Sequence, residues 1–211
     1  MPAKIKICGI TNLTDAQLAL KLGANLLGFN FYPPSPRYID PSAAAPIIAE
    51  LPDHIKAVGV FVDAGTAGIQ KVLSQCSLKM VQLHGAENTQ QCLQAAALGV
   101  EVIKALRIQQ PEDISRINDY QVETFLLDAF HEKLYGGTGH RFDWSWLRQT
   151  SHQKIFLAGG ITPENVTEAL IVGTYGVDLC SGVEESPGIK SPDKMKKLFE
   201  EIKRFNLSQL D

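Results

Sequence analysis

The feature that most constrains the fold is a repeat of short apolar runs, each followed by a segment with helix signals. Eight such runs start at intervals of about 20 to 30 residues, which leaves room for one crossover helix between consecutive strands. Because the runs are apolar on both faces, they suit buried parallel strands. The predicted strands are Ile5–Cys8, Leu26–Phe31, Ala57–Phe61, Met80–Leu83, Val102–Ala105, Phe125–Asp128, Ile155–Ala158 and Val177–Cys180. Eight alternating strand-helix units predict an α/β fold, a single small (βα)8 TIM barrel.

Helix boundary signals support this alternation. Gly23 follows the predicted helix Thr14–Leu22 and is a natural helix stop. Thr162 is a candidate N-cap, with Pro163 at the first helical position of a helix that reaches Ile171. Further helices are expected over Pro41–Leu51, over Asn88–Leu98 and from Ser191 onward, whereas Gln109–Tyr120 has room only for a degenerate helix.

The chain shows no linker, low-complexity tract or shift in composition, so residues 1–211 are expected to form one catalytic domain. Its 211 residues are few for a barrel of this kind, which typically has about 250, and tight loops must compensate. The alternative architecture is an open doubly wound sheet. It is disfavoured because no G-x-G-x-x-G sequence follows the first strand.

Charge and cysteine content exclude several classes of function. A net charge of −3 argues against a nucleic-acid or anionic-membrane partner. No apolar run approaches the roughly 20 residues of a membrane span, and the N-terminal residues lack a signal-peptide pattern. The four cysteines form no C-x-x-C pattern, so they predict neither a zinc site nor a local redox pair, but free thiols in a reducing cytosol. We therefore expect a cytoplasmic monomer or weak homodimer without a metal.

Glycine pairs after the last two predicted strands indicate a phosphate site. In a barrel, functional groups gather at the carboxyl ends of the strands. Gly159–Gly160 and Ser181–Gly182 occupy such positions, where glycine lets backbone amides approach an anion closely. The segment Gly136–Gly139 follows the sixth strand, and within it Gly137 and Thr138 are candidate substrate contacts. The alternative is that these glycines only make tight turns.

Cys8 and Asp128 are the acid-base candidates, because they end strands one and six and would face the same barrel mouth. A thiolate is a good base once its pKa falls. Asp128 follows an apolar run, where its charge must reach the mouth or be paired. The alternatives are a buried structural thiol for Cys8 and a capping or loop aspartate for Asp128.

Three further side chains are candidates for contacts with a substrate. Arg37 follows a proline-rich stretch that reduces loop flexibility, and a fixed guanidinium suits bidentate recognition of a carboxylate. Its alternative role is that of a solvated surface arginine. His84 follows strand four and Asp178 lies in strand eight, where each could touch substrate or only support the loops.

Several of these segments resemble the sequence motifs of phosphoribosylanthranilate isomerases. The two most specific are Lys6–Thr11, which reads KICGIT, and Gly28–Tyr38, which reads GFNFYPPSPRY. Further similar segments follow in order as far as residue 190: Gly59–Val62, Val81–Gly85, Leu127–Asp128, Gly136–Gly139, Phe142–Trp144, Leu157–Ile161, Gly176–Glu184 and Pro187–Lys190.

The resemblance implies a (βα)8 barrel that converts N-(5-phosphoribosyl)anthranilate to 1-(o-carboxyphenylamino)-1-deoxyribulose 5-phosphate in tryptophan biosynthesis, without metal or organic cofactor. It further implies Cys8 as general base, Asp128 as general acid and Arg37 as the group that holds the anthranilate carboxylate. The amides of Gly159–Gly160 and Ser181–Gly182 would hold the phosphate.

Three other functions are alternatives to this one. The sister isomerase of histidine synthesis usually carries an aspartate where Cys8 stands and needs a phosphate site in each half barrel. A barrel synthase acting on the next intermediate would need a catalytic lysine at a strand end, but Lys6 lies inside its strand. A non-catalytic barrel that binds a sugar phosphate would be expected to lose Cys8 or Asp128, and both are present.

Overall fold

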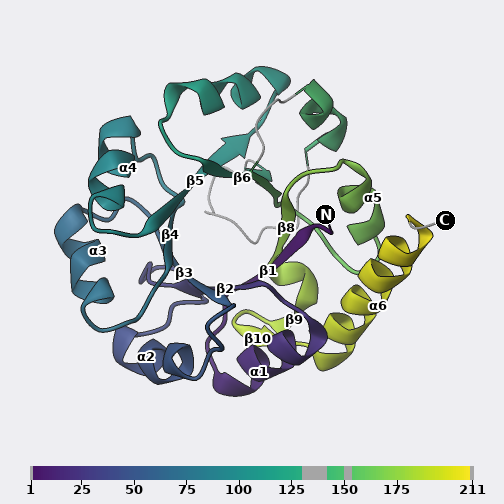
Figure 1. The fold of residues 1–211 in the computed structure, drawn as a ribbon, viewed down its shortest axis with the longest axis horizontal. Helices are drawn as coiled ribbons and strands as arrows, with labels where there is room; N and C mark the ends of the chain where they lie inside the picture. The colour runs from purple at the N-terminus through teal and green to yellow at the C-terminus, as the bar shows by residue number, and fades with distance from the viewer. Residues whose placement is uncertain (1, 130–141, 150–153, 210–211) are drawn as a thin grey trace.

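The computed structural model describes residues 2–129, 142–149 and 154–209. It contains a closed barrel of parallel strands in the order β1 to β8, ringed by helices (Figure 1). The barrel strands are β1 (Lys4–Cys8), β2 (Leu26–Asn30), β3 (Lys56–Phe61), β4 (Met80–Leu83), β5 (Glu101–Ile108), β6 (Thr124–Ala129), β7 (Ile155–Leu157) and β8 (Gly176–Leu179). The predicted (βα)8 fold is confirmed, and the open doubly wound sheet is excluded.

The helices cover the outside of the barrel. They are α1 (Leu13–Leu22), α2 (Pro41–Ala49), α3 (Thr66–Leu73), α4 (Thr89–Ala96), α5 (Val166–Ile171) and α6 (Pro192–Ser208). The described residues also include the 3₁₀ helices η1 (Pro111–Asp119), η2 (Trp144–Gln149) and η3 (Ser181–Val183). A small antiparallel hairpin, β9 (Glu184–Ser186) and β10 (Ile189–Lys190), precedes α6 and was not expected from the sequence.

Most helix boundaries follow from local capping. Gly23 ends α1 in the left-handed conformation with φ of 112°, and the Ser191 side chain caps α6 by accepting from the Lys194 amide. The segment between β5 and β6 is the degenerate helix η1, as expected. The prediction of Thr162 as N-cap was wrong, because Asn165 holds that place. The Asn165 side chain accepts from the Thr162 amide and donates to the Gly160 carbonyl, so residues 162–165 form a turn.

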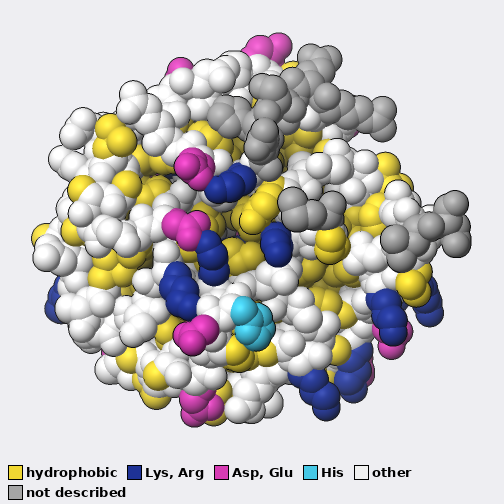
Figure 2. Space-filling model, in the orientation of Figure 1, with side chains coloured by type: hydrophobic (Ala, Val, Ile, Leu, Met, Phe, Trp, Pro, Cys, Tyr) yellow, Lys and Arg dark blue, Asp and Glu magenta, His cyan; other side chains and the backbone are white. Residues whose placement is uncertain are grey.

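Apolar side chains form two cores, one on each side of the barrel wall. The outer core joins the strands to the helices, and the inner core fills the barrel with Leu26, Val58, Met80, Ile103, Ala105, Leu126, Phe156 and Ala158. At the face where the strands begin, charged side chains surround a hollow lined in part by Lys4, His54, Lys56, Glu101 and Lys154 (Figure 2). The inner core closes the barrel below its mouth, where the carboxyl ends of the strands lie.

A buried ion pair ties the mouth ends of three strands together on the outside of the barrel. Lys104 of β5 lies 2.7 Å from Glu87, and each side chain is 1% exposed. The Lys104 ammonium also donates to the carbonyls of Leu83 and Gly85 after β4. Glu87 accepts from the Asp63 amide after β3. The pair therefore fixes the loops that follow β3 and β4.

Glu87→Ala is expected to lower the free energy of unfolding by about 3–5 kcal/mol, because it leaves the Lys104 ammonium buried without its counter-charge. Urea denaturation followed by circular dichroism measures the change. The control is Glu123→Ala, which breaks the exposed pair with Lys154 and should change stability little. Equal losses in the two variants would contradict this account.

Candidate active site

One pocket opens at the carboxyl ends of the barrel strands. It is lined by Cys8, Asn30, Ser35, Arg37, Val60, Val62, Gln82, His84, Asp128, Ala158, Gly159, Gly160, Ile161, Asp178, Cys180, Ser181 and Gly182. Every described residue that the sequence analysis proposed for the site is among them. Gly137 and Thr138 lie outside the described residues, so their proposed substrate contacts are not addressed by the structure.

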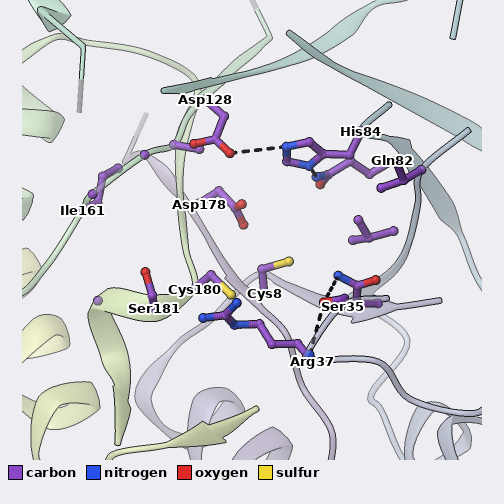
Figure 3. A pocket seen from close by; sticks show the side chains of 17 residues that line it. Cys8, Ser35, Arg37, Gln82, His84, Asp128, Ile161, Asp178, Cys180 and Ser181 are labelled. Atoms are coloured by element: carbon purple, nitrogen blue, oxygen red, sulfur yellow. Dashed lines mark hydrogen bonds and ion pairs between the residues drawn. The ribbon is translucent and has the colours of Figure 1, made fainter. Parts of the chain in front are cut away.

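Cys8 and Asp128 face the pocket from different strands. Figure 3 shows Asp128 and Cys8 on opposite sides of the cavity, with Asp178 between them in that view. Both side chains are buried, with 8% of Cys8 and 5% of Asp128 exposed. One group that can carry a proton thus lies across the pocket from one that can accept one.

Asp128 is oriented by its neighbours. Its Oδ1 accepts from the amide of Ala129, and its Oδ2 lies 3.3 Å from His84 Nε2, an ion-pair distance without the alignment of a hydrogen bond. The Gln82 amide nitrogen lies 2.7 Å from His84 Nδ1. If the amide donates there, the proton of a neutral imidazole is on Nε2, the nitrogen that faces Asp128. Gln82 was not predicted as a site residue, although it is a polar side chain within an apolar strand.

Beneath the pocket, Lys6 and Asp178 form a buried ion pair with 2.8 Å between Nζ and Oδ1. Burial opposes the Lys6 charge, but the negative charges of Asp178 and Cys8 raise its pKa above the usual value. Burial raises the pKa of Asp178 to about 6, although Lys6 acts against the rise. The pair places the ammonium group of Lys6 near Cys8.

Arg37 is held in place by Glu184, which the sequence analysis did not propose. Its Nε lies 3.0 Å from each Glu184 carboxylate oxygen, and its Nη2 donates to Oε2 at 2.7 Å. Glu184 also accepts from the buried ammonium of Lys190 at 2.9 Å. The alternative of a solvated Arg37 is excluded, because its side chain is only 12% exposed. Arg37 also lines the pocket, so its guanidinium is within reach of a ligand there.

The ends of β7 and β8 form a cradle of backbone. Gly159 and Gly160 have φ of 87° and 64°, a conformation that L side chains rarely adopt. A Cβ at Gly182 would lie 1.9 Å from the carbonyl oxygen of Ile161, so the two loops touch directly. Ser181 and Gly182 begin the short helix η3. This geometry leaves backbone amides beside the pocket, where they suit an oxyanion.

Among the described residues, no group of three or more His, Cys, Asp or Glu side chains could hold a metal ion. In the same part of the chain, no helix is both long and apolar enough to cross a membrane.

The fold and the pocket together are those of a TIM-barrel enzyme whose mouth carries Cys8, Asp128, Arg37 and two glycine-containing turns. The sequence model of the N-(5'-phosphoribosyl)anthranilate isomerase family matches residues 5–201. This chain belongs to that family.

Curated relatives and solved structures agree with this assignment. The N-(5'-phosphoribosyl)anthranilate isomerase of Citrifermentans bemidjiense is 45% identical over 206 residues, covering 97% of this chain and 98% of the relative. The phosphoribosyl anthranilate isomerase structure from Thermotoga maritima has a TM-score of 0.89 and 39% identity, covering 96% of this chain and 99% of that one. The Thermus thermophilus enzyme has a TM-score of 0.86 and 36% identity, covering 99% and 100%.

Proposed function

We propose that this chain catalyses the Amadori rearrangement of N-(5-phosphoribosyl)anthranilate to 1-(o-carboxyphenylamino)-1-deoxyribulose 5-phosphate in tryptophan biosynthesis. The observation that carries the proposal is that one pocket gathers Cys8, Asp128, Arg37 and the two glycine-containing turns. Family membership supports the same reaction. A related phosphoribosyl anthranilate isomerase has been solved with the reduced form of this product.

The substrate is anchored at both ends. The amides of Gly159, Gly160, Ser181 and Gly182 hold the phosphate, and the Arg37 guanidinium holds the anthranilate carboxylate. Holding both ends places the sugar between Cys8 and Asp128 and reduces the entropy cost of reaching the reactive geometry. Asp178 lies at the pocket floor, where it can contact the sugar hydroxyls.

The reaction needs one acid and one base on opposite sides of the sugar. Asp128 delivers a proton to the ring oxygen, which opens the ribose with help from the anthranilate nitrogen and gives an imine. The Cys8 thiolate then removes the proton from C2, and the resulting enolamine tautomerises to the ketone. His84 keeps the Asp128 carboxyl directed into the pocket. Each positioned group typically contributes about 10²–10⁴-fold to the rate.

Two candidate functions from the sequence analysis fit this pocket less well. The sister isomerase would place an aspartate where the Cys8 thiol stands, and a sugar-phosphate sensor would have no use for facing acid and base groups.

We also propose that residues 1–211 act as one catalytic domain. The chain would be a cytoplasmic monomer or weak homodimer. Its free cysteines suit a reducing compartment, and the related enzyme from Thermotoga maritima is described as dimeric.

Cys8→Ser and Asp128→Asn are each expected to lower kcat by about 10²-fold or more with little change in KM, because each removes a proton-transfer group. Steady-state fluorescence assays with substrate generated in situ measure both constants. The controls are Cys92→Ala and Asp53→Asn, which alter the same residue types outside the pocket and should keep kcat. Near-normal turnover in Cys8→Ser would rule out its role as base.

Arg37→Ala is expected to lower kcat/KM by about 10- to 100-fold, mainly through KM, since a hydrogen bond to a charged group contributes about 1.5–3 kcal/mol. The same assay separates the two constants. Arg204→Ala, which changes an exposed arginine of α6, serves as the control. An unchanged KM in Arg37→Ala would show that the carboxylate is bound elsewhere.

Gly182→Ala is expected to raise KM, and the inhibition constant of inorganic phosphate, by at least about tenfold. The new Cβ meets the Ile161 backbone and forces the two phosphate loops apart. The control is Gly68→Ala in α3, where an added Cβ has no neighbour within 4 Å. Phosphate inhibition at the wild-type level in a folded Gly182→Ala protein would contradict the cradle.

A further inference from the structure

A second hollow lies at the end of the barrel where the strands begin, opposite the mouth that carries Cys8 and Asp128. Figure 2 looks onto this face and shows dark blue Lys and Arg side chains around yellow apolar side chains at its centre. The hollow has a volume of about 140 Å³ and shares no lining residue with the pocket at the mouth. The reaction proposed above makes no use of it.

The polar lining of this hollow follows from the alternation of side chains along the barrel strands. Residues two apart in a strand point to the same side of the sheet. Val58 of β3 and Leu126 of β6 belong to the inner core, so Lys56 and Thr124, two residues earlier, also point inward. Lys4 of β1 lines the hollow with them. Because barrel interiors are usually filled by bulky apolar side chains, packing alone does not explain this polar layer.

The lining carries more positive than negative charge. It contains the ammonium groups of Lys4, Lys56 and Lys154 and the carboxylate of Glu101. Lys56 pairs with Glu101, and Lys154 pairs at 2.7 Å with Glu123, which lies outside the lining. Both pairs are partly exposed to solvent, where ion pairs contribute little to stability. Within the described part of the chain, the Lys4 ammonium has no hydrogen-bond or ion-pair partner, so it is available to a ligand.

Thr124 adds a buried hydroxyl without a partner. The residue is only 5% exposed and lines the hollow. Its hydroxyl forms no hydrogen bond with any residue that the structure describes. A buried polar group left in this state costs free energy, which a hydrogen bond to a ligand oxygen would offset. Lys4 and Thr124 thus provide two donors for the same anionic group.

The floor of the hollow is apolar. Leu26, Met80 and Phe156 lie there, and each is at most 4% exposed. The Tyr175 ring forms one wall and packs edge-on against Phe156, with 5.4 Å between the ring centroids and 86° between the planes. An apolar cavity of about 150 Å³ is large enough to bind benzene. The hollow therefore has the size and the floor to accept one aromatic ring.

We propose that this hollow is a binding site for a small aromatic carboxylate, whose ring lies on Met80 and Phe156 and whose carboxylate binds Lys4 and Thr124. An inorganic anion would leave the apolar floor uncovered, and an uncharged ring would leave both donors without an acceptor. Glu101 opposes the ligand charge, but its pairing with Lys56 limits the repulsion. The site lies at the other end of the barrel from the acid-base groups, so it is independent of the proposed reaction.

The test is the binding of benzoate to the whole protein, followed by the amide chemical shifts in two-dimensional NMR. Saturable shifts are expected around Lys4, Thr124 and Tyr175. They should persist in Arg37→Ala, which weakens any binding of benzoate at the mouth. Benzyl alcohol lacks the charge and inorganic phosphate lacks the ring, so each should bind at this end at least about tenfold more weakly. Shifts confined to the mouth, or equal affinity for the three probes, would overturn the proposal.

Substitutions in the lining then test the two donors. Lys4→Gln should weaken benzoate binding about tenfold and Thr124→Val about threefold, because they remove a charge-assisted and a neutral hydrogen bond. Glu101→Gln should strengthen binding, since it removes the repulsion and releases Lys56. The control is Lys79→Gln, which changes a lysine just before β4 but outside the lining and should keep the wild-type affinity. Unchanged affinity in folded Lys4→Gln and Thr124→Val would refute the proposal.

Discussion

Pairing between the first and last strands is the constraint on which the pocket depends. The register of β1 against β8 sets Lys6 opposite Asp178 inside the barrel, and their buried ion pair lies directly beneath the pocket. One step further along both strands, the same register brings Cys8 to Cys180. A slip of one residue would turn these side chains out of the barrel. Closure of the barrel by β1 and β8 therefore forms the floor of the pocket, and the loops contribute further lining residues.

A second set of buried charges holds the rim. Glu184 joins Arg37 to Lys190, and Lys190 in turn reaches the backbone of Cys8. Taking such charges out of water costs free energy, which partner charges and hydrogen bonds offset. The arrangement makes Arg37 rigid before any ligand arrives, which reduces the ordering cost of binding. The hairpin of β9 and β10 thus serves the site by presenting Glu184 and Lys190.

Local signals predicted most of the fold and of the pocket. Apolar runs placed all eight strands within a few residues, because buried parallel strands need side chains that are apolar on both faces. Because the carboxyl ends of the barrel strands meet at one mouth, Cys8, Asp128 and Arg37 could be predicted to lie in one pocket. Partners of buried charges could not be identified, since pairs such as Lys6 with Asp178 depend on register between distant strands. Lys6 and Lys104, charged within apolar strands, were the available signal that such partners must exist.

The most direct test of the central claim is the fluorescence decay of phosphoribosylanthranilate, generated in situ, on addition of the purified wild-type protein. The account predicts rapid decay that scales with protein concentration and yields 1-(o-carboxyphenylamino)-1-deoxyribulose 5-phosphate. A folded protein that binds inorganic phosphate but leaves the decay at its uncatalysed rate would contradict the account. That result would point instead to the sister substrate or to a barrel that only binds sugar phosphates.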